Sequence, residues 1–212
     1  MKIGLILFMS VFSINLLANG NVAKGKAKSA VCVACHGATG NSSSTAYPKL
    51  AGQGEAYLLK QLRDFKSQTR KNGTMFGMVA SLSDTDMQNL AAFFSSQKIT
   101  PNVAKKDKKM LELGERIYRG GKLDTNTTAC IACHGVRGKG IPSAKFPALA
   151  FQHADYIDSQ LKNFRQASFD AQENKTSSNT RTNDPAKMMR NIAKSLTNKE
   201  IKALAEYIAG LH

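Results

Sequence analysis

The sequence predicts an all-α protein made of two tandem domains that are related by an internal repeat. Three observations support this prediction. The pentapeptide Cys-Xaa-Xaa-Cys-His occurs twice, the residues around its two copies can be aligned, and apolar residues recur at helical spacing with no competing alternating pattern. All four cysteines of the 212-residue chain lie in these two pentapeptides.

Residues 1–18 have the features of a secretory signal peptide. Lys2 supplies a basic start, a largely apolar stretch follows, and Ala18 is a small residue suited to signal peptidase. The apolar stretch is shorter than the roughly 20 residues that a membrane span needs, and polar residues interrupt it. We therefore expect an exported, periplasmic protein whose leader is cleaved.

The first half is predicted to be helical throughout. A helix over about residues 22–35 leads into the first pentapeptide. A second helix follows the next loop, because the apolar residues of 58–65 recur at helical spacing. The last helix begins near Ser83, which together with Asp86 resembles a capping box.

The second half repeats these elements. Its first helix begins at about residues 112–121, its second carries the apolar residues of 157–164, and its last begins at a capping box of Thr197 and Glu200. The matching segments of the repeat are residues 36–40 with 134–138, 47–51 with 146–150, and 57–62 with 156–161.

The pentapeptide is typical of c-type haem attachment. Its two thiols bond covalently to the vinyl groups of a haem, and the adjacent histidine becomes an axial ligand of the iron. We therefore expect two covalently bound haem c groups. The predicted attachment residues are Cys32, Cys35, Cys130 and Cys133, and the predicted iron-binding histidines are His36 and His134.

Three other interpretations of the pentapeptides explain fewer of the observed residues. A thioredoxin-like redox pair would need a preceding strand, and none is predicted. A zinc site would have to join two triplets that lie far apart in the sequence, and local disulfides would leave both histidines without a role.

Because each of the two repeat units carries one haem-attachment pentapeptide, we expect each unit to form one haem domain. We expect a signal peptide over residues 1–18, an N-terminal haem domain over 19–100, a linker over 101–109, and a C-terminal haem domain over 110–212. The linker is assigned from its proline and its run of charged residues.

A second axial ligand decides what each iron can do, since histidine with methionine makes a high-potential electron carrier. The repeat selects Met75 and Met189, which occupy the same position before the last helix of each half. Met78 aligns as a core residue would, Met87 falls on the core face of a helix, and Met110 precedes the first helix of the second half. We expect these three methionines to be packing residues.

His153 and His212 are the rival axial ligands, but neither has a counterpart in the first half. A ligating histidine usually donates its other ring N–H to a fixed acceptor. The carbonyl groups of Pro48 and Pro147, which lie at matching places after the pentapeptides, are the predicted acceptors.

Taken together, these residues resemble the cytochrome c4 family of dihaem periplasmic cytochromes over nearly all of the mature chain. The segments that carry the resemblance are residues 32–40, 47–53, 57–62, 75, 130–138, 183–184, 188–190 and 204–211. One departure is the polar segment of about residues 168–187, which lengthens the second half relative to the first.

The resemblance implies two domains of the cytochrome c fold related by a pseudo-twofold axis. It implies that His36 and Met75 bind one iron and that His134 and Met189 bind the other. It also implies electron transfer in a respiratory chain, with a membrane quinol-cytochrome c oxidoreductase as donor and a terminal oxidase as acceptor.

The charge fits a protein that meets acidic partners, because 30 basic residues against 15 acidic ones give a formal net charge of +15. We expect association with redox proteins or an anionic membrane surface, and neither nucleic acid nor a small-molecule substrate. The predicted function is an electron carrier rather than an enzyme. Two alternatives stay open: the haem subunit of a flavocytochrome-type dehydrogenase, and a dihaem peroxidase, which would need a five-coordinate iron.

Overall fold

The computed structural model describes residues 20–104, 107–177 and 180–212, and every named element within these ranges is a helix. The all-α prediction is therefore confirmed for this part of the chain. The predicted signal peptide, residues 1–18, lies outside the described residues. Within the described ranges, none of the helices combines the length and the apolar character needed to cross a bilayer.

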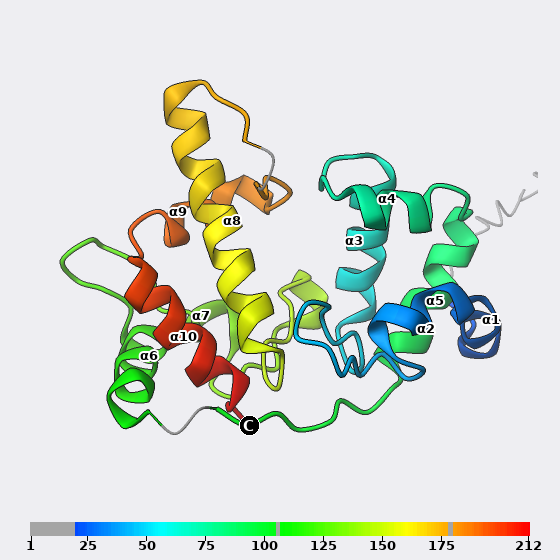
Figure 1. Ribbon diagram of the computed structural model, residues 1–212, viewed down its shortest axis with the longest axis horizontal. Helices are drawn as coiled ribbons and strands as arrows, with labels where there is room; N and C mark the ends of the chain where they lie inside the picture. Colours follow the sequence, from blue (N-terminus) through cyan, green and yellow to red (C-terminus); the bar gives the residue numbers. More distant parts are fainter. Residues whose placement is uncertain (1–19, 105–106, 178–179) are drawn as a thin grey trace, which may run out of the picture.

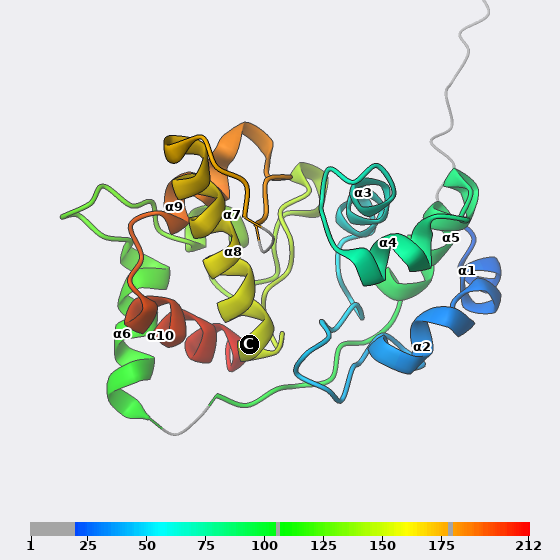
Figure 2. The same ribbon diagram turned by 45° about the horizontal axis from the view of Figure 1, so that its top comes forward.

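The two halves of the chain lie side by side, and the segment that follows the last helix of the first half runs along one edge toward the second (Figures 1 and 2). The first half contains α1 (Val22–Lys28), α2 (Ala30–His36), α3 (Glu55–Lys66), α4 (Gly73–Val79) and α5 (Asp84–Ser95). The second half contains α6 (Lys108–Gly120), α7 (Ile131–His134), η1 (Pro142–Ala144), α8 (Ala154–Glu173), η2 (Pro185–Lys187), α9 (Met188–Ala193) and α10 (Asn198–Ala209).

Each half has an apolar core of its own. The buried members of the first core are Leu58, Phe65, Val79, Leu82, Met87, Leu90, Ala91, Phe93 and Phe94. The buried members of the second core are Ile117, Tyr118, Ile157, Leu161, Leu196, Ile201, Leu204, Ala205, Ile208 and Leu211. Met87 is among them, as predicted. Separate cores make each half a packing unit, in agreement with the repeat.

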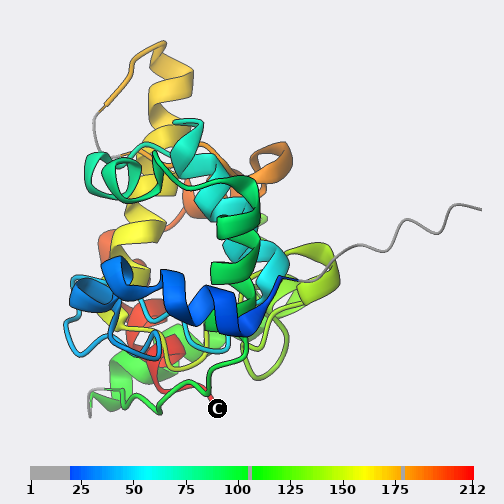
Figure 3. The same ribbon diagram turned by 90° about the vertical axis from the view of Figure 1, so that its right-hand side faces the viewer.

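The first and last helices of each half cross at a glycine. In the first half Gly25 of α1 lies against the backbone of Asn89 in α5, and Figure 3 shows α1 running across α5. In the second half Gly114 of α6 lies against the backbone of Ala203 in α10. An added methyl group would overlap the opposing carbonyl at either crossing, so only glycine permits this approach.

Both predicted capping boxes are present. The Ser83 hydroxyl accepts from the N–H of Asp86, whose carboxylate accepts from the N–H of Ser83, and this exchange begins α5. Thr197 and Glu200 exchange the same pair of hydrogen bonds at the start of α10. These two pairs satisfy backbone donors that the first turn of a helix leaves open.

Two helix boundaries differ from the prediction. The helix expected over residues 22–35 is divided into α1 and α2 at Ser29, whose hydroxyl donates to the carbonyl of Lys26. The first helix of the second half begins at Lys108, because Asp107 caps it by accepting from the N–H of Met110. Met110 therefore lies in the first turn of α6 and not before the helix. The limits given to the two domains and the linker stay a prediction.

Candidate haem sites

The first pentapeptide occupies the C-terminal part of α2. Cys32 and Cys35 are partly buried, His36 is buried, and Gly37 ends the helix with φ 78°, a left-handed value that glycine adopts without strain. The Nδ1 atom of His36 lies 2.9 Å from the carbonyl oxygen of Pro48. A carbonyl can only accept, so Nδ1 carries the proton. The predicted role of Pro48 as acceptor is confirmed.

The second pentapeptide has the same geometry around α7. His134 is buried, Gly135 ends the helix with φ 76°, and the Nδ1 atom of His134 lies 2.9 Å from the carbonyl oxygen of Pro147. The hydroxyl of the fully buried Tyr118 donates to the carbonyl of Gly135 at 2.7 Å and so holds the end of the helix. The predicted role of Pro147 is confirmed as well.

Burial keeps both imidazoles neutral. It lowers the pKa of His36 and of His134, and the hydrogen bonds to Pro48 and Pro147 oppose this shift only in part. With Nδ1 protonated, the lone pair lies on Nε2, and in the described part of the chain neither Nε2 atom has a hydrogen-bond partner. A neutral imidazole oriented in this way can bind a metal.

No disulfide joins the four cysteines. Before attachment, burial raises the pKa of the Cys32 thiol and, to about 11, that of the Cys130 thiol. No group of three or more histidine, cysteine or carboxylate side chains within the described ranges could hold a metal ion, and no strand precedes either pentapeptide there. Paired thiols beside a fixed histidine fit the attachment of haem c, whereas a zinc site and a thioredoxin-like pair lack their supporting residues.

The two candidate methionines lie where the repeat placed them. Met75 of α4 is partly buried and packs against the first core, as Cys32 does. Met189 of α9 packs in the same way against the second core together with Cys130. Met78, which we expected in the core, is 45% exposed; its place facing the core is taken by Val79.

Two hydrogen-bonded pairs hold the helices that carry these methionines. Asn72 caps α4 by accepting from the N–H of Met75 at 2.8 Å. In the second half, the buried carboxylate of Asp184 accepts from the backbone N–H of Arg190 at 3.0 Å and from its guanidinium at 2.7 Å. The chain is thereby fixed on either side of Met189.

The rival histidines are engaged elsewhere. His153 is buried between the halves, with Nε2 2.9 Å from the carbonyl oxygen of Ser42 and Nδ1 near the amide of Asn102. His212 is exposed, and its Nδ1 atom lies 2.9 Å from the carbonyl oxygen of Gly210. Neither belongs to a pentapeptide, which leaves the methionines as the better candidates.

Two arginines connect the halves, and the guanidinium carbon of each lies over the ring of a phenylalanine of its own half, 4.6 Å from the centroid for Arg70 and 4.5 Å for Arg181. Arg70 stacks on Phe65 and donates to the hydroxyl of Tyr156 at 3.0 Å. Arg181 stacks on Phe164 and donates to the hydroxyl of Tyr57 at 2.9 Å. Each arginine thus reaches the tyrosine of the opposite half.

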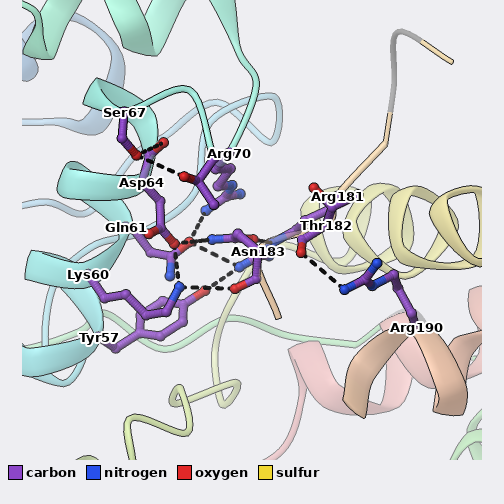
Figure 4. Close-up of polar contacts among 11 residues, drawn as sticks. Tyr57, Lys60, Gln61, Asp64, Ser67, Arg70, Arg181, Thr182, Asn183 and Arg190 are labelled. Carbon is purple, nitrogen blue, oxygen red and sulfur yellow. Dashed lines mark hydrogen bonds and ion pairs between the residues drawn. The ribbon is translucent and has the colours of Figure 1, made fainter. Parts of the chain in front are cut away.

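Amide side chains complete this contact, and Figure 4 shows them between α3 and the segment that carries Arg181 and Asn183. Arg70, Arg181 and Asn183 all donate to the amide oxygen of Gln61. Burial alone would raise the pKa of Tyr57, but the positive charges of Arg181 and Arg70 outweigh burial and lower it. Arg181 and Asn183 belong to the polar segment that lengthens the second half, so their bonds to Gln61 hold this segment against the first half.

The sequence analysis assigned no role to the polar residues of this interface. Gln53 and Gln152 occupy equivalent positions of the repeat, and each bonds the backbone of the other half. Their equivalence in sequence was the available indication. Arg181 gave none, because the longer segment displaces it from the position that matches Arg70.

Comparison with known proteins agrees with this geometry. A family model for cytochrome c matches residues 22–98 and 114–212. The chain is 46% identical to cytochrome c4 of Pseudomonas aeruginosa over 196 residues, which cover 92% of this chain and 90% of that protein. It is 36% identical to the thiosulfate dehydrogenase electron acceptor of Stutzerimonas stutzeri, over 85% of this chain and 78% of that protein.

Among solved structures, reduced recombinant cytochrome c4 from Pseudomonas stutzeri superposes with a TM-score of 0.81 at 44% identity, over 91% of this chain and all of that chain. Fold, repeat, pentapeptides and relatives therefore agree. The chain belongs to the cytochrome c4 family of electron-carrying cytochromes and binds two covalently attached haem c groups.

Proposed function

We propose that this protein carries electrons in the periplasm as part of a respiratory chain, with each haem iron held between a histidine and a methionine. The ligand pairs are His36 with Met75 and His134 with Met189. The observation that carries the proposal is the packing of each core, which brings one attachment cysteine and one candidate methionine to the same apolar cluster.

Haem c bound at these sites would supply a one-electron couple between ferrous and ferric iron. The chain contributes rigid ligands. Pro48 and Pro147 hold the histidine rings, and the Asn72 cap and the Asp184 carboxylate hold the helices of the two methionines. Fixed ligands leave little to rearrange when the charge changes, which suits transfer of an electron rather than binding of a substrate.

The partners proposed are a membrane quinol-cytochrome c oxidoreductase as donor and a terminal oxidase as acceptor. The formal charge of +15 favours an approach to acidic surfaces on such partners or to an anionic membrane face. Export by a cleaved leader over residues 1–18 belongs to the same proposal.

The methionine assignment is tested by replacing one ligand at a time. Met75→Ala should remove about half of the sulfur-to-iron charge-transfer absorbance of the ferric protein, because one of two equivalent sites is lost. Met78→Ala is the matched control, since this methionine lies on the same helix but is exposed. Retention of the full band in Met75→Ala would contradict the assignment. High-spin absorption in the unmodified protein would instead support a peroxidase.

A second candidate function follows from one relative. The thiosulfate dehydrogenase electron acceptor of Stutzerimonas stutzeri matches most of this chain, which supports a role as the haem protein that accepts electrons from a dehydrogenase. Stopped-flow reduction separates the two candidates. The purified protein is mixed with quinol and a quinol-cytochrome c oxidoreductase in one experiment, and with thiosulfate and a thiosulfate dehydrogenase in the other. The faster reduction identifies the donor.

A further inference from the structure

Gln53 binds the backbone of the opposite half in both directions. Its amide oxygen accepts from the N–H of Ala148 at 2.8 Å, and its amide nitrogen donates to the carbonyl of Ala148 at 2.9 Å. The residue is only 8% exposed. Buried hydrogen bonds of this kind are costly to lose, because the donor and acceptor that remain have no water molecule to bond in place of the amide.

Gln152 makes the mirror-image contact with the first half. Its amide oxygen accepts from the N–H of Lys49 at 2.9 Å, and its amide nitrogen donates to the carbonyl of Lys49 at 2.9 Å. Lys49 and Ala148 are equivalent residues of the repeat, as are Gln152 and Gln53. The interface is therefore reciprocal at this point.

Each glutamine is also fixed to its own half. The oxygen of Gln53 accepts from the N–H of Gly54, and the oxygen of Gln152 accepts from the N–H of His153, both at 3.0 Å. Gly54 and His153 are the N-cap residues of α3 and α8. The amide group of Gln53 is thus fixed to the start of α3, and that of Gln152 to the start of α8.

The bonded peptides are the ones that support the histidines. The N–H of Ala148 and the carbonyl of Pro147 belong to one planar peptide group, and that carbonyl accepts from Nδ1 of His134. The peptide group between Pro48 and Lys49 stands in the same relation to His36. A hydrogen bond to the N–H fixes the plane of such a group and polarises its carbonyl, which strengthens the bond that the carbonyl accepts.

We propose that Gln53 and Gln152 are crossed positioning residues, each of which sets the hydrogen bond of the axial histidine in the opposite half. The proposal rests on the proposed ligation by His36 and His134. A stronger bond from Nδ1 to the carbonyl makes the imidazole a more basic ligand. Basic ligands favour ferric over ferrous iron, so each glutamine lowers the reduction potential of the opposite haem. Any shift of one half against the other therefore changes both potentials.

The test uses Gln53→Met and Gln152→Met in the haem-loaded, full-length mature protein. Methionine has nearly the volume of glutamine but makes neither hydrogen bond. The readouts are the ring-methyl NMR signals of the two ferric haems, each assigned to its half by contacts with nearby side chains, and the two midpoint potentials. The unmodified protein is measured first, so a failure of the ligand assignment appears in its spectrum before any variant is compared.

Gln53→Met should raise the potential and shift the methyl signals of the second haem alone, and Gln152→Met should do so for the first haem alone. Each variant is thus the matched control of the other. Gln160→Met, which loosens the same interface without touching either proline segment, should not give the crossed pattern. A shift of the haem in the substituted half, equal shifts of both haems, or no shift would overturn the proposal. If either methionine variant fails to give a native circular dichroism spectrum, Gln→Asn at the same position withdraws the amide with less disruption, and the same outcomes apply.

Discussion

Replacing Gly114 by alanine should strongly destabilise the second domain, because this glycine permits a close approach of α6 and α10. A Cβ atom at position 114 would lie 2.2 Å from the carbonyl oxygen of Ala203 and 2.7 Å from Cβ of Tyr207. Ordinary contact begins at 3.4 Å. The opposing oxygen belongs to the backbone of α10 and cannot rotate away, so the two helices must separate by about 1 Å.

Overpacking a well-packed core costs about 1–3 kcal/mol, and a clash with rigid backbone belongs at the upper end of this range. In a domain of about 100 residues each kcal/mol lowers the melting temperature by about 4–8 °C. A loss of about 10–20 °C is therefore expected for the second domain. The first domain has a separate core, so its loss should be smaller and limited to the hydrogen bonds that it shares with the second domain.

Gly120→Ala is the matched control, because Gly120 lies on the same helix and an added Cβ would meet nothing within 4 Å. This substitution should leave the stability unchanged or raise it by up to about 1 kcal/mol. Thermal unfolding of the haem-loaded protein is followed by far-UV circular dichroism and by the Soret band. An unchanged melting temperature in Gly114→Ala, or an equal loss in Gly120→Ala, would refute the reasoning.

Two further predictions concern charge. Burial alone would raise the pKa of Glu200, but hydrogen bonds from Thr197 and Lys122 lower it below its ordinary 4.5. The Glu200 carboxylate therefore stabilises the fold above pH 4.5. This stabilisation is lost as the pH falls through the lowered pKa. Glu200→Gln should therefore cost about 1 kcal/mol in urea unfolding at neutral pH and nothing in strong acid, and an equal cost at both would be inconsistent with this linkage. Association with an acidic redox partner should slow as ionic strength rises, because the protein has a formal charge of +15. A stopped-flow rate that does not depend on salt would remove electrostatic steering from the account.

The features that sequence predicted well are those set by neighbouring residues. A capping box needs a hydroxyl and a carboxylate three residues apart, so Ser83 with Asp86 and Thr197 with Glu200 could be identified directly. The acceptors Pro48 and Pro147 were found because they occupy equivalent positions in the aligned segments 47–51 and 146–150 of the repeat. In both cases the chemistry and the spacing are local.

The expectations that were wrong depended on competition between neighbours. Met78 and Val79 are adjacent apolar residues of a short helix, and which of them faces the core depends on how α4 lies against α3. The boundary at Ser29 arose because its hydroxyl bonds the carbonyl of Lys26, a choice that serine makes readily near helix ends. Helical periodicity does not distinguish these outcomes.

The contacts between the two halves are more alike than the sequence alignment of the repeat indicates. Arg70 follows Phe65 closely, whereas Arg181 is separated from Phe164 by the end of α8 and a returning segment. Yet each arginine stacks on the phenylalanine of its own half and donates to the tyrosine of the other. The alignment fails where the second half is longer, but the longer α8 and its return bring Arg181 to the equivalent place. Because the guanidinium and not its position in the chain makes the contact, the added residues preserve the reciprocal contacts between the two halves.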